Sequence, residues 1–338
     1  MERVIDIYNH FMPPRYFQRF GEVVRDKGMA KRMGGIAMLH DLEARMRMMD
    51  RWPGYQQVLA PAPPPPESFG SAAASIELTR IGNDGLAEIC ARHPDRFPAF
   101  VAAVPMNDVP AALAEIERAI TQLDARGIQL FTHVNSRPLD DPEFLPVFEA
   151  MATRYRLPIL LHPVRTPATS DYAAEPKSRF EIWQVLGWPH DTSVALARLV
   201  FSGMLDRFPE LTVVSHHLGG TVPYLEGRLG PLWDQLGSRT ADEDYSALLA
   251  SMKRRPVDYF RMFHGDTVVG GSEAALRCGL SFFGVGHVLF GSDCPFDPEG
   301  GPMFIRENLR AVDALELPAA DRRKLLSGNA ASMLRLAS

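Results

Sequence analysis

The sequence predicts an α/β fold in which eight parallel strands alternate with helices in a (β/α)8, TIM-like barrel. Short apolar runs typical of buried strands recur along the chain, and most are followed by a loop and then by a stretch with helical spacing. No Gly-rich phosphate turn follows the first run, so an open doubly wound sheet has little support. The predicted strands cover residues 4–7, 57–60, 99–104, 127–131, 158–161, 211–215, 259–263 and 288–290.

Helical spacing is clearest in four stretches between these runs. Strands that alternate with helices pair in parallel through crossover connections, and eight such units in one chain favour closure into a barrel. No linker divides the sequence, so residues 1–338 are predicted to form one barrel domain. The four helical stretches are residues 110–125, 144–155, 192–208 and 301–315.

Three inserts interrupt the repeat, at residues 11–40, 61–80 and 164–190. Each follows the carboxyl end of a predicted strand, which in a barrel is the active-site face. The second insert begins with a proline-rich run that cannot donate ladder hydrogen bonds. We therefore expect the inserts to form loops or lids over a site.

Composition excludes several classes of protein. A formal net charge of −5 gives no basic footprint for nucleic acid, and no apolar run is long enough to span a bilayer. Asp6 interrupts the first apolar stretch, which argues against a secretory signal. Cys90, Cys278 and Cys294 form no CxxC pair. The sequence therefore predicts a cytoplasmic protein in a reducing setting, without disulfides.

Histidines gather at the ends of the predicted strands. A single strand-end histidine is more often structural than functional, but a barrel would bring all of these to one opening, where Asp293 also lies. The pattern predicts a metal site or an acid/base site. Six of the ten histidines have this placement: His10, His133, His162, His216, His217 and His264.

Several short motifs together resemble the amidohydrolase superfamily, and most closely its aminocarboxymuconate semialdehyde decarboxylase-like branch. They occur in the family's order and span nearly the whole chain, with weaker matches at residues 45–50 and 223–228. The main motifs are Asp6-x-x-x-His10, Leu161-His162-Pro163, His217-Leu218-Gly219-Gly220 and Gly291-Ser292-Asp293-x-Pro295.

The resemblance implies a role for each matched residue. His10 and His162 would be metal ligands, and Asp293 would be a carboxylate ligand that also moves protons. His217 would activate water or polarise the substrate. Arg228 would bind a substrate carboxylate, for which a planar guanidinium is well suited.

Other residues near these motifs are weaker candidates for substrate binding. His133 is expected to line the pocket and His264 to reach substrate. Asp266 is expected either to orient an imidazole or to serve an ordinary loop. Arg45 and Arg47 match a helix with a substrate-binding arginine, and the alternative is a solvated helix face.

Two neighbours of the motif residues are expected to be structural. If the strand continues through both histidines, His216 points away from His217, and we expect it to pack between barrel and helix. Cys294 follows Asp293 and is expected to be a buried, inert thiol.

Tyr8 is the departure from the family, which usually has histidine there and in some aromatic-acid decarboxylases glutamate. A phenol ligates well only as phenolate, and its ordinary pKa is about 10. Three alternatives follow: Tyr8 is a weak ligand, the metal is lost, or the site keeps His10, His162, Asp293 and water. We prefer the last, because catalytic zinc commonly uses three protein ligands and an open position.

These residues imply a divalent metal, Zn2+ first and Mn2+ as the alternative, and a small carboxylate substrate. We expect a non-oxidative decarboxylase of a carboxylated aromatic or unsaturated acid. The alternatives are a hydrolase of a C–C, lactone or amide bond, and a metal-free homologue that only binds ligand. The resemblance also implies a homodimer or homotetramer.

Overall fold

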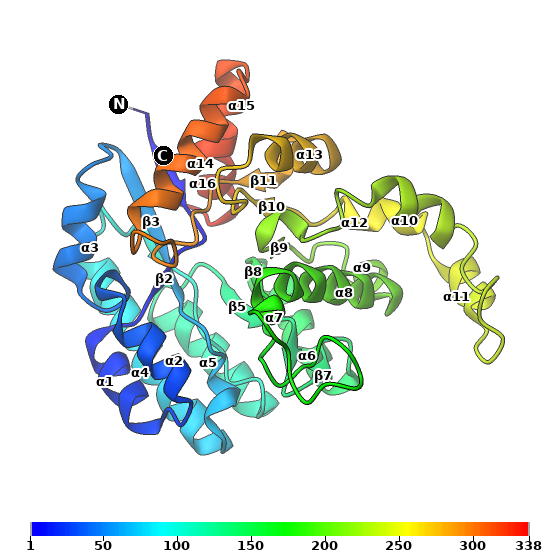
Figure 1. Ribbon diagram of the computed structural model, residues 1–338, viewed down its shortest axis with the longest axis horizontal. Helices are drawn as coiled ribbons and strands as arrows, with labels where there is room; N and C mark the ends of the chain where they lie inside the picture. Colours follow the sequence, from blue (N-terminus) through cyan, green and yellow to red (C-terminus); the bar gives the residue numbers. More distant parts are fainter. Residues whose placement is uncertain (1, 337–338) are drawn as a thin grey trace.

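The computed structural model describes residues 2–336. Its strands stand side by side around the middle of the molecule, and its helices lie outside them (Figure 1). The strands are β1 (Val4–Asp6), β2 (His10–Phe11), β3 (Tyr55–Pro61), β4 (Ala99–Phe100), β5 (Ile128–Phe131), β6 (His133–Val134), β7 (Arg137–Pro138), β8 (Ile159–His162), β9 (Val213–Ser215), β10 (His264–Asp266) and β11 (Val288–Leu289).

Helices connect most of these strands. They are α1 (Pro14–Val23), α2 (Lys27–Gly34), α3 (Leu42–Met49), α4 (Ala72–Arg92), α5 (Val109–Gln122), α6 (Leu145–Glu149), α7 (Ile182–Val185), α8 (Gly187–Phe201), α9 (Met204–Arg207), α10 (Glu226–Trp233), α11 (Tyr245–Ser251), α12 (Pro256–Phe260), α13 (Glu273–Phe283), α14 (Pro302–Ala314), α15 (Ala319–Arg323) and α16 (Asn329–Met333).

The parallel strands form two sheets that meet at both edges. In one sheet β3 pairs with β1, β2 and β4, and the other has the order β11-β10-β9-β8-β5. Single parallel bridges join the sheets, Ala102 to Ile128 on one side and Asn9 to Cys294 on the other. The predicted parallel α/β architecture is confirmed, and the two sheets are joined by isolated bridges rather than by continuous ladders.

The predicted strands overlap the observed ones except at residues 259–263, and only Ala99–Phe100 of the run 99–104 forms a strand. The run 259–263 was expected to be the seventh strand, but its first half belongs to α12, and the strand is β10, which starts at His264. Pro256 occupies the first turn of α12, where its missing N–H costs nothing. A short buried helix and a buried strand show the same continuous apolar run, so periodicity does not separate them.

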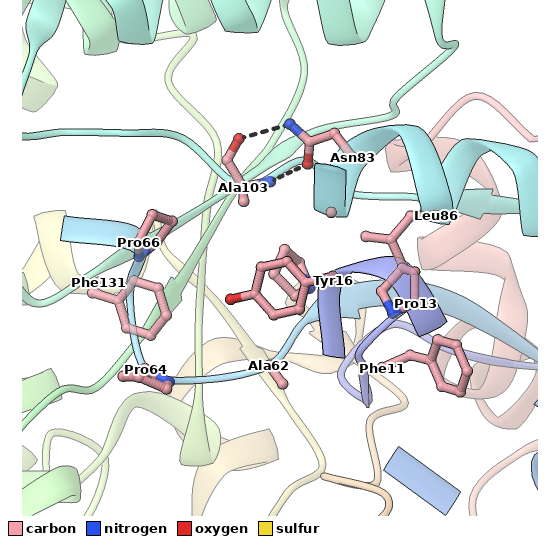
Figure 2. Close-up of a pocket in the computed structure, with 12 residues that line it drawn as sticks. Phe11, Pro13, Tyr16, Ala62, Pro64, Pro66, Asn83, Leu86, Ala103 and Phe131 are labelled. Atoms are coloured by element: carbon pink, nitrogen blue, oxygen red, sulfur yellow. Dashed lines mark hydrogen bonds between the residues drawn. The ribbon is translucent and has the colours of Figure 1, made fainter. Parts of the chain in front are cut away.

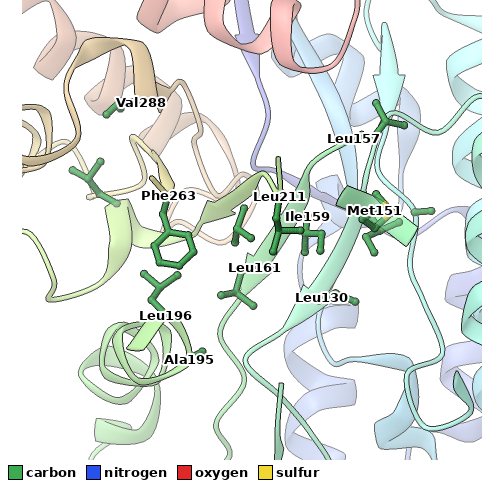
Figure 3. Close-up of a cluster of buried hydrophobic side chains, with 14 of the residues drawn as sticks. Leu130, Met151, Leu157, Ile159, Leu161, Ala195, Leu196, Leu211, Phe263 and Val288 are labelled. Carbon is green, nitrogen blue, oxygen red and sulfur yellow. The ribbon is translucent and has the colours of Figure 1, made fainter. Parts of the chain in front are cut away.

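The apolar side chains of the strands pack into two clusters. Ile159 and Leu161 of β8 pack outward with Leu196 of α8 and Phe263 (Figure 3), while Leu160 between them packs with Val214 in a second cluster. Successive side chains of a strand point to opposite faces. The core therefore has a layer between strands and helices and another inside the circuit.

The three inserts form short helices at the carboxyl ends of strands. The first contains α1 and α2, the second begins after β3 and leads into α4, and the third ends in α7 and the start of α8. Within residues 2–336, no helix is long and apolar enough to cross a membrane.

Candidate metal centre

His10 is the first imidazole of the site and is held rigidly. It begins β2, its side chain is fully buried, and its Nδ1 lies 2.8 Å from the carbonyl oxygen of Pro61. A carbonyl only accepts hydrogen bonds, so Nδ1 carries the proton and Nε2 has a free lone pair. Arg45, which is also buried, donates to the carbonyl oxygen of His10 at 2.5 Å.

His162 presents its ring in the same way from the last position of β8. Its Nδ1 lies 2.6 Å from the carbonyl oxygen of Pro163, which leaves Nε2 free. The centroids of the His10 and His162 rings are 5.1 Å apart. Both predicted histidine ligands therefore offer the same nitrogen to one region.

His216 lies in this cluster, which corrects our expectation that it packs between barrel and helix. Strand β9 ends at Ser215, and His217 and Leu218 both have φ of 53°, so the alternation of side chains stops there. The His216 and His217 rings lie on the same side, with centroids 3.9 Å apart. The Nδ1 of His216 is 2.6 Å from Oδ2 of Asp266, so Asp266 orients an imidazole.

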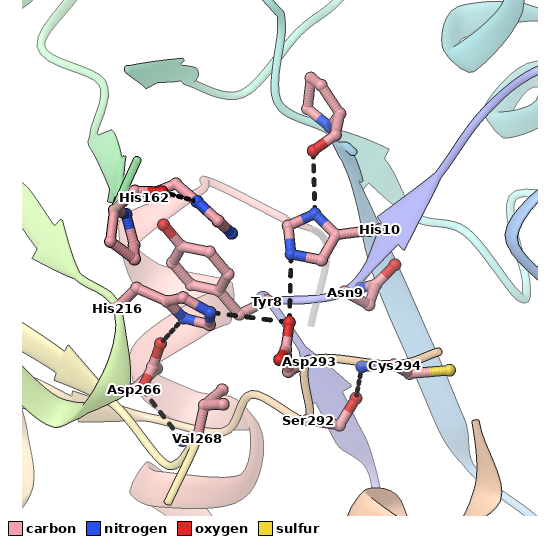
Figure 4. Close-up of polar contacts among 12 residues, drawn as sticks. Tyr8, Asn9, His10, His162, His216, Asp266, Val268, Ser292, Asp293 and Cys294 are labelled. Carbon is pink, nitrogen blue, oxygen red and sulfur yellow. Dashed lines mark hydrogen bonds and ion pairs between the residues drawn. The ribbon is translucent and has the colours of Figure 1, made fainter. Parts of the chain in front are cut away.

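Asp293 supplies the carboxylate. Its Oδ1 lies 3.3 Å from Nε2 of His10 and 3.6 Å from Nε2 of His216 (Figure 4). Its backbone N–H donates to the carbonyl oxygen of Tyr8 at 2.8 Å, which ties the end of the last strand to the first.

These donors fit a divalent metal. Ligand atoms of His10, His162 and His216 lie within 4.8 Å of one another, as do those of His216, His217 and Asp293. Nε2 of His10 and Nε2 of His216 are buried without a hydrogen-bond partner among the described residues. Buried nitrogens of this kind are costly unless something binds them. Imidazole nitrogens with one carboxylate are a donor set used by zinc and related ions.

The charges at the centre are strongly coupled. Burial lowers the pKa of His216, but Asp266 and Asp293 outweigh that effect and raise it to about 9. Burial and the neighbouring imidazoles hold the pKa of His162 well below its ordinary value. Burial raises the pKa of Asp293, but the adjacent His10 and His216 imidazoles outweigh it, so this pKa lies well below the ordinary value. Asp293 is therefore an anion at neutral pH.

Tyr8 contacts the cluster with the face of its ring. The ring stacks on His216 at a centroid distance of 3.9 Å and an angle of 16°. Its hydroxyl is buried and finds no hydrogen-bond partner among residues 2–336. Burial, with the nearby charges of Asp266 and Asp293, raises the pKa of Tyr8 well above its ordinary value. In the protein alone this residue is a neutral phenol.

His217, the predicted catalytic imidazole, lies at the edge of the centre. Its Nδ1 is buried without a partner among the described residues. Burial, and then the charge of His216, lowers the pKa of His217 to about 3. The ring is therefore neutral at physiological pH and able to accept or donate one hydrogen bond.

Four other predicted site residues lie outside the two clusters. Arg228 is exposed on α10, and Arg47 is exposed on α3, 3.5 Å from Glu43. The backbone N–H of Ser136 donates to Nδ1 of His133. His264 stacks on a neighbouring imidazole, and burial lowers its pKa to about 3. Their roles in substrate binding stay predictions.

Arg32 is a cation near the centre that the sequence did not reveal, because it sits in the first insert without a motif. Its guanidinium lies 5.2 Å above the ring of Phe296, and that ring is 5.4 Å from the ring of His10. Its Nη1 donates to Gln184 in the third insert at 2.8 Å. Burial lowers the pKa of Arg32, and the charges of Asp293 and Glu181 oppose that shift.

Aromatic rings surround the two predicted histidine ligands. Phe131 and Trp188 lie 5.3 and 5.6 Å from the His162 ring, and Phe296 faces His10. Phe131 and Pro61 also line an adjacent apolar pocket, where Tyr16 projects toward Pro64 and Phe131 (Figure 2). Flat apolar walls next to a cation site suit a flat substrate with a charged group.

The chain belongs to the amidohydrolase family, whose model matches residues 5–336. The predicted family is therefore confirmed. A gamma-resorcylate decarboxylase from Rhizobium radiobacter is 31% identical over 84% of this chain and 86% of its own. A 6-methylsalicylic acid decarboxylase from Penicillium expansum is 29% identical over 96% of this chain and 94% of its own.

A solved structure of 2,6-dihydroxybenzoate decarboxylase in complex with 2,6-dihydroxybenzoate has the same fold. It superposes with a TM-score of 0.80 at 26% identity, and the match covers 99% of both chains. The family and the fold of this chain thus agree with those of decarboxylases of aromatic acids.

Proposed function

We propose that this protein is a metal-dependent, non-oxidative decarboxylase of small hydroxylated aromatic acids. The observation that carries the proposal is that His10 lies close to both His162 and Asp293 at one end of the strands, in a chain whose relatives are decarboxylases of this substrate class. The decarboxylase prediction is thus favoured over the hydrolase and the metal-free alternatives.

His10, His162 and Asp293 would hold the metal. When bound, a divalent cation supplies the positive charge that holds a substrate carboxylate together with its neighbouring hydroxyl oxygen. Mixed nitrogen and oxygen donors suit both zinc and manganese. Zinc remains our first expectation, and manganese is the alternative.

Asp293 is suited to move the proton. It is ionised in the free protein, so it takes the proton of the substrate hydroxyl and delivers it to the ring carbon that bears the carboxylate. The bond from that carbon to the carboxylate then breaks, its electron pair returns to the ring, and CO2 leaves. His217 is neutral and would hydrogen-bond the hydroxyl oxygen that gives up its proton.

Arg32 and the aromatic walls would bind the rest of the substrate. The guanidinium stands over Phe296 on the His10 side, where a second anionic or hydroxyl group of the ring would meet it. Phe131 and Trp188 would contact the ring faces. This arrangement favours planar hydroxybenzoates.

The test is release of CO2 from a panel of hydroxybenzoates that includes 2,6-dihydroxybenzoate and 6-methylsalicylate, with Zn2+-loaded, Mn2+-loaded and chelator-treated protein. Decarboxylation should need metal, and Asp293→Asn should lower kcat by roughly 1000-fold while the protein stays folded. An exposed-carboxylate variant, Glu88→Gln, serves as the matched control.

Two outcomes would contradict the proposal. A product that keeps its carboxylate and takes up oxygen-18 from water would point to hydrolysis. Ligand binding with no turnover and no bound metal would point to a binding protein.

A further inference from the structure

We propose that His216 is a direct metal ligand that replaces the side chain missing at position 8. This inference rests on the metal site of the proposed function and adds a ligand to it. The centre then has three imidazoles and one carboxylate: His10, His162, His216 and Asp293.

The first step is that position 8 carries a phenol in place of an imidazole. Tyr8 is fully buried, and its ring lies flat on His216. The backbone of Gly291 approaches it so closely that an added Cβ would lie 2.9 Å from Cβ of Tyr8. The tyrosine is therefore tightly packed at its Cβ, and its ring packs against the ring of His216.

The second step is that His216 is prepared to ligate. Its Nδ1 is engaged by Asp266, and Asp266 in turn accepts backbone N–H groups of Leu218 and Val268, each at 3.0 Å. A metal-binding histidine generally has its other nitrogen held by a carboxylate or carbonyl in this way. His10 and His162 show the same arrangement with backbone carbonyls.

The third step is the spacing of the donor atoms. Two ligand atoms about 2.1 Å from one tetrahedral ion lie roughly 3.4 Å apart. Oδ1 of Asp293 is 3.3 Å from Nε2 of His10 and 3.6 Å from Nε2 of His216. The two imidazoles thus stand in equivalent positions about the carboxylate, and His162 shares their cluster (Figure 4).

The fourth step separates His216 from His217. Ligand atoms of His217 lie in a cluster with His216 and Asp293, but the cluster with His10 and His162 contains His216. His216 alone belongs to both. In the proposed centre, the imidazole after β9 therefore takes the role of the one that the family usually has at position 8, where this chain has a phenol.

The experiment measures bound metal rather than activity. Wild-type protein and single variants are dialysed against Zn2+ and against Co2+, and metal content and affinity are determined. His216→Ala should lose affinity by ~100-fold or more, as should His10→Ala, and Asp266→Asn by ~10-fold or more. Tyr8→Phe and His217→Ala should stay within about threefold of wild type, like the control His93→Ala.

Added imidazole should restore Co2+ binding to His216→Ala, which a merely misfolded variant would not show. A second measurement needs no variant: X-ray absorption of the Zn2+-loaded wild-type protein should count three imidazoles. Two imidazoles, or metal loss in Tyr8→Phe but not in His216→Ala, would overturn the assignment. If the His216 assignment fails but the wild-type protein binds Zn2+ and releases CO2, the proposed function still holds. If the wild-type protein binds no metal, both the proposed function and the His216 assignment fail.

Discussion

At the scale of single residues, two arginines on α3 show how position along a helix decides whether a side chain is buried or exposed. Arg45 and Arg47 are two positions apart on α3, so they point to different sides. Arg45 is fully buried and donates to Met38, Gln57 and His10, whereas Arg47 is exposed. The buried charge of Arg45 thus supports the backbone of His10, a predicted metal ligand.

A buried carboxyl group in the second insert predicts a pH dependence of stability. Glu67 is almost fully buried, its Oε2 has no partner among the described residues, and burial raises its pKa from 4.5 to about 7. The raised pKa means that the folded protein holds this proton more tightly than the unfolded chain. The contribution of protonated Glu67 to the free energy of unfolding is therefore complete below pH 4.5 and is lost as pH rises through 7.

Glu67→Gln should therefore unfold with a smaller pH dependence between pH 5 and 8, and should be more stable than wild type at pH 8 by ~2–3 kcal/mol. Urea denaturation at both pH values measures this. The exposed-site variant Glu88→Gln should follow the wild-type curve, and a Glu67→Gln curve parallel to wild type would contradict the assignment.

At the scale of elements, the turn after β9 sets the directions of the His216 and His217 side chains. Regular strand geometry would send His216 and His217 to opposite faces. Two successive residues with positive φ instead turn the backbone, and the N–H of Leu218 bonds to Asp266. The end of one strand therefore decides whether the centre has a third imidazole.

Helix α14 depends on a single carboxylate at its start. Asp297 accepts the backbone N–H groups of Glu299, Gly301 and Phe304 at 2.7–3.1 Å, close behind the loop that carries Asp293. Asp297→Ala should lower the free energy of unfolding by ~1–2 kcal/mol, because buried N–H groups lose their acceptor.

Thermal or urea denaturation measures that loss. The control is Glu299→Ala, two residues after Asp297. It removes a surface ion pair with Arg306 and should cost less than ~1 kcal/mol. Equal losses in the two variants would show that Asp297 does not cap the helix.

At the scale of the whole molecule, the candidate centre brings together residues from distant segments of the chain. His10, His162, His216 and Asp293 come from opposite parts of the circuit, including the edge where a single bridge joins β1 and β2 to the last strand. An ion bound here links segments that no continuous ladder connects. The expected oligomer stays a prediction.

Metal should therefore raise thermal stability. A ligand that binds only the folded state adds ~2.7 kcal/mol at one hundred times its Kd. Zn2+-loaded protein should melt several degrees above chelator-treated protein by differential scanning calorimetry. His10→Ala should lose this difference, and an unchanged wild-type melting temperature after metal removal would place the ion outside the folded core.

The sequence by itself determined the family and the parallel α/β architecture, because the period of apolar residues and the order of short motifs are local properties. Of the six strand-end histidines expected at one opening, four lie in the two clusters, and His133 and His264 lie outside them. It did not separate a buried helix from a strand at residues 259–263, since both bury a continuous apolar run. Only the tertiary structure decided that His216 faces the centre, that Tyr8 stacks beneath it and that Arg32 approaches from an insert. Those positions depend on a backbone turn and on contacts between segments far apart in the chain, which a residue pattern does not encode.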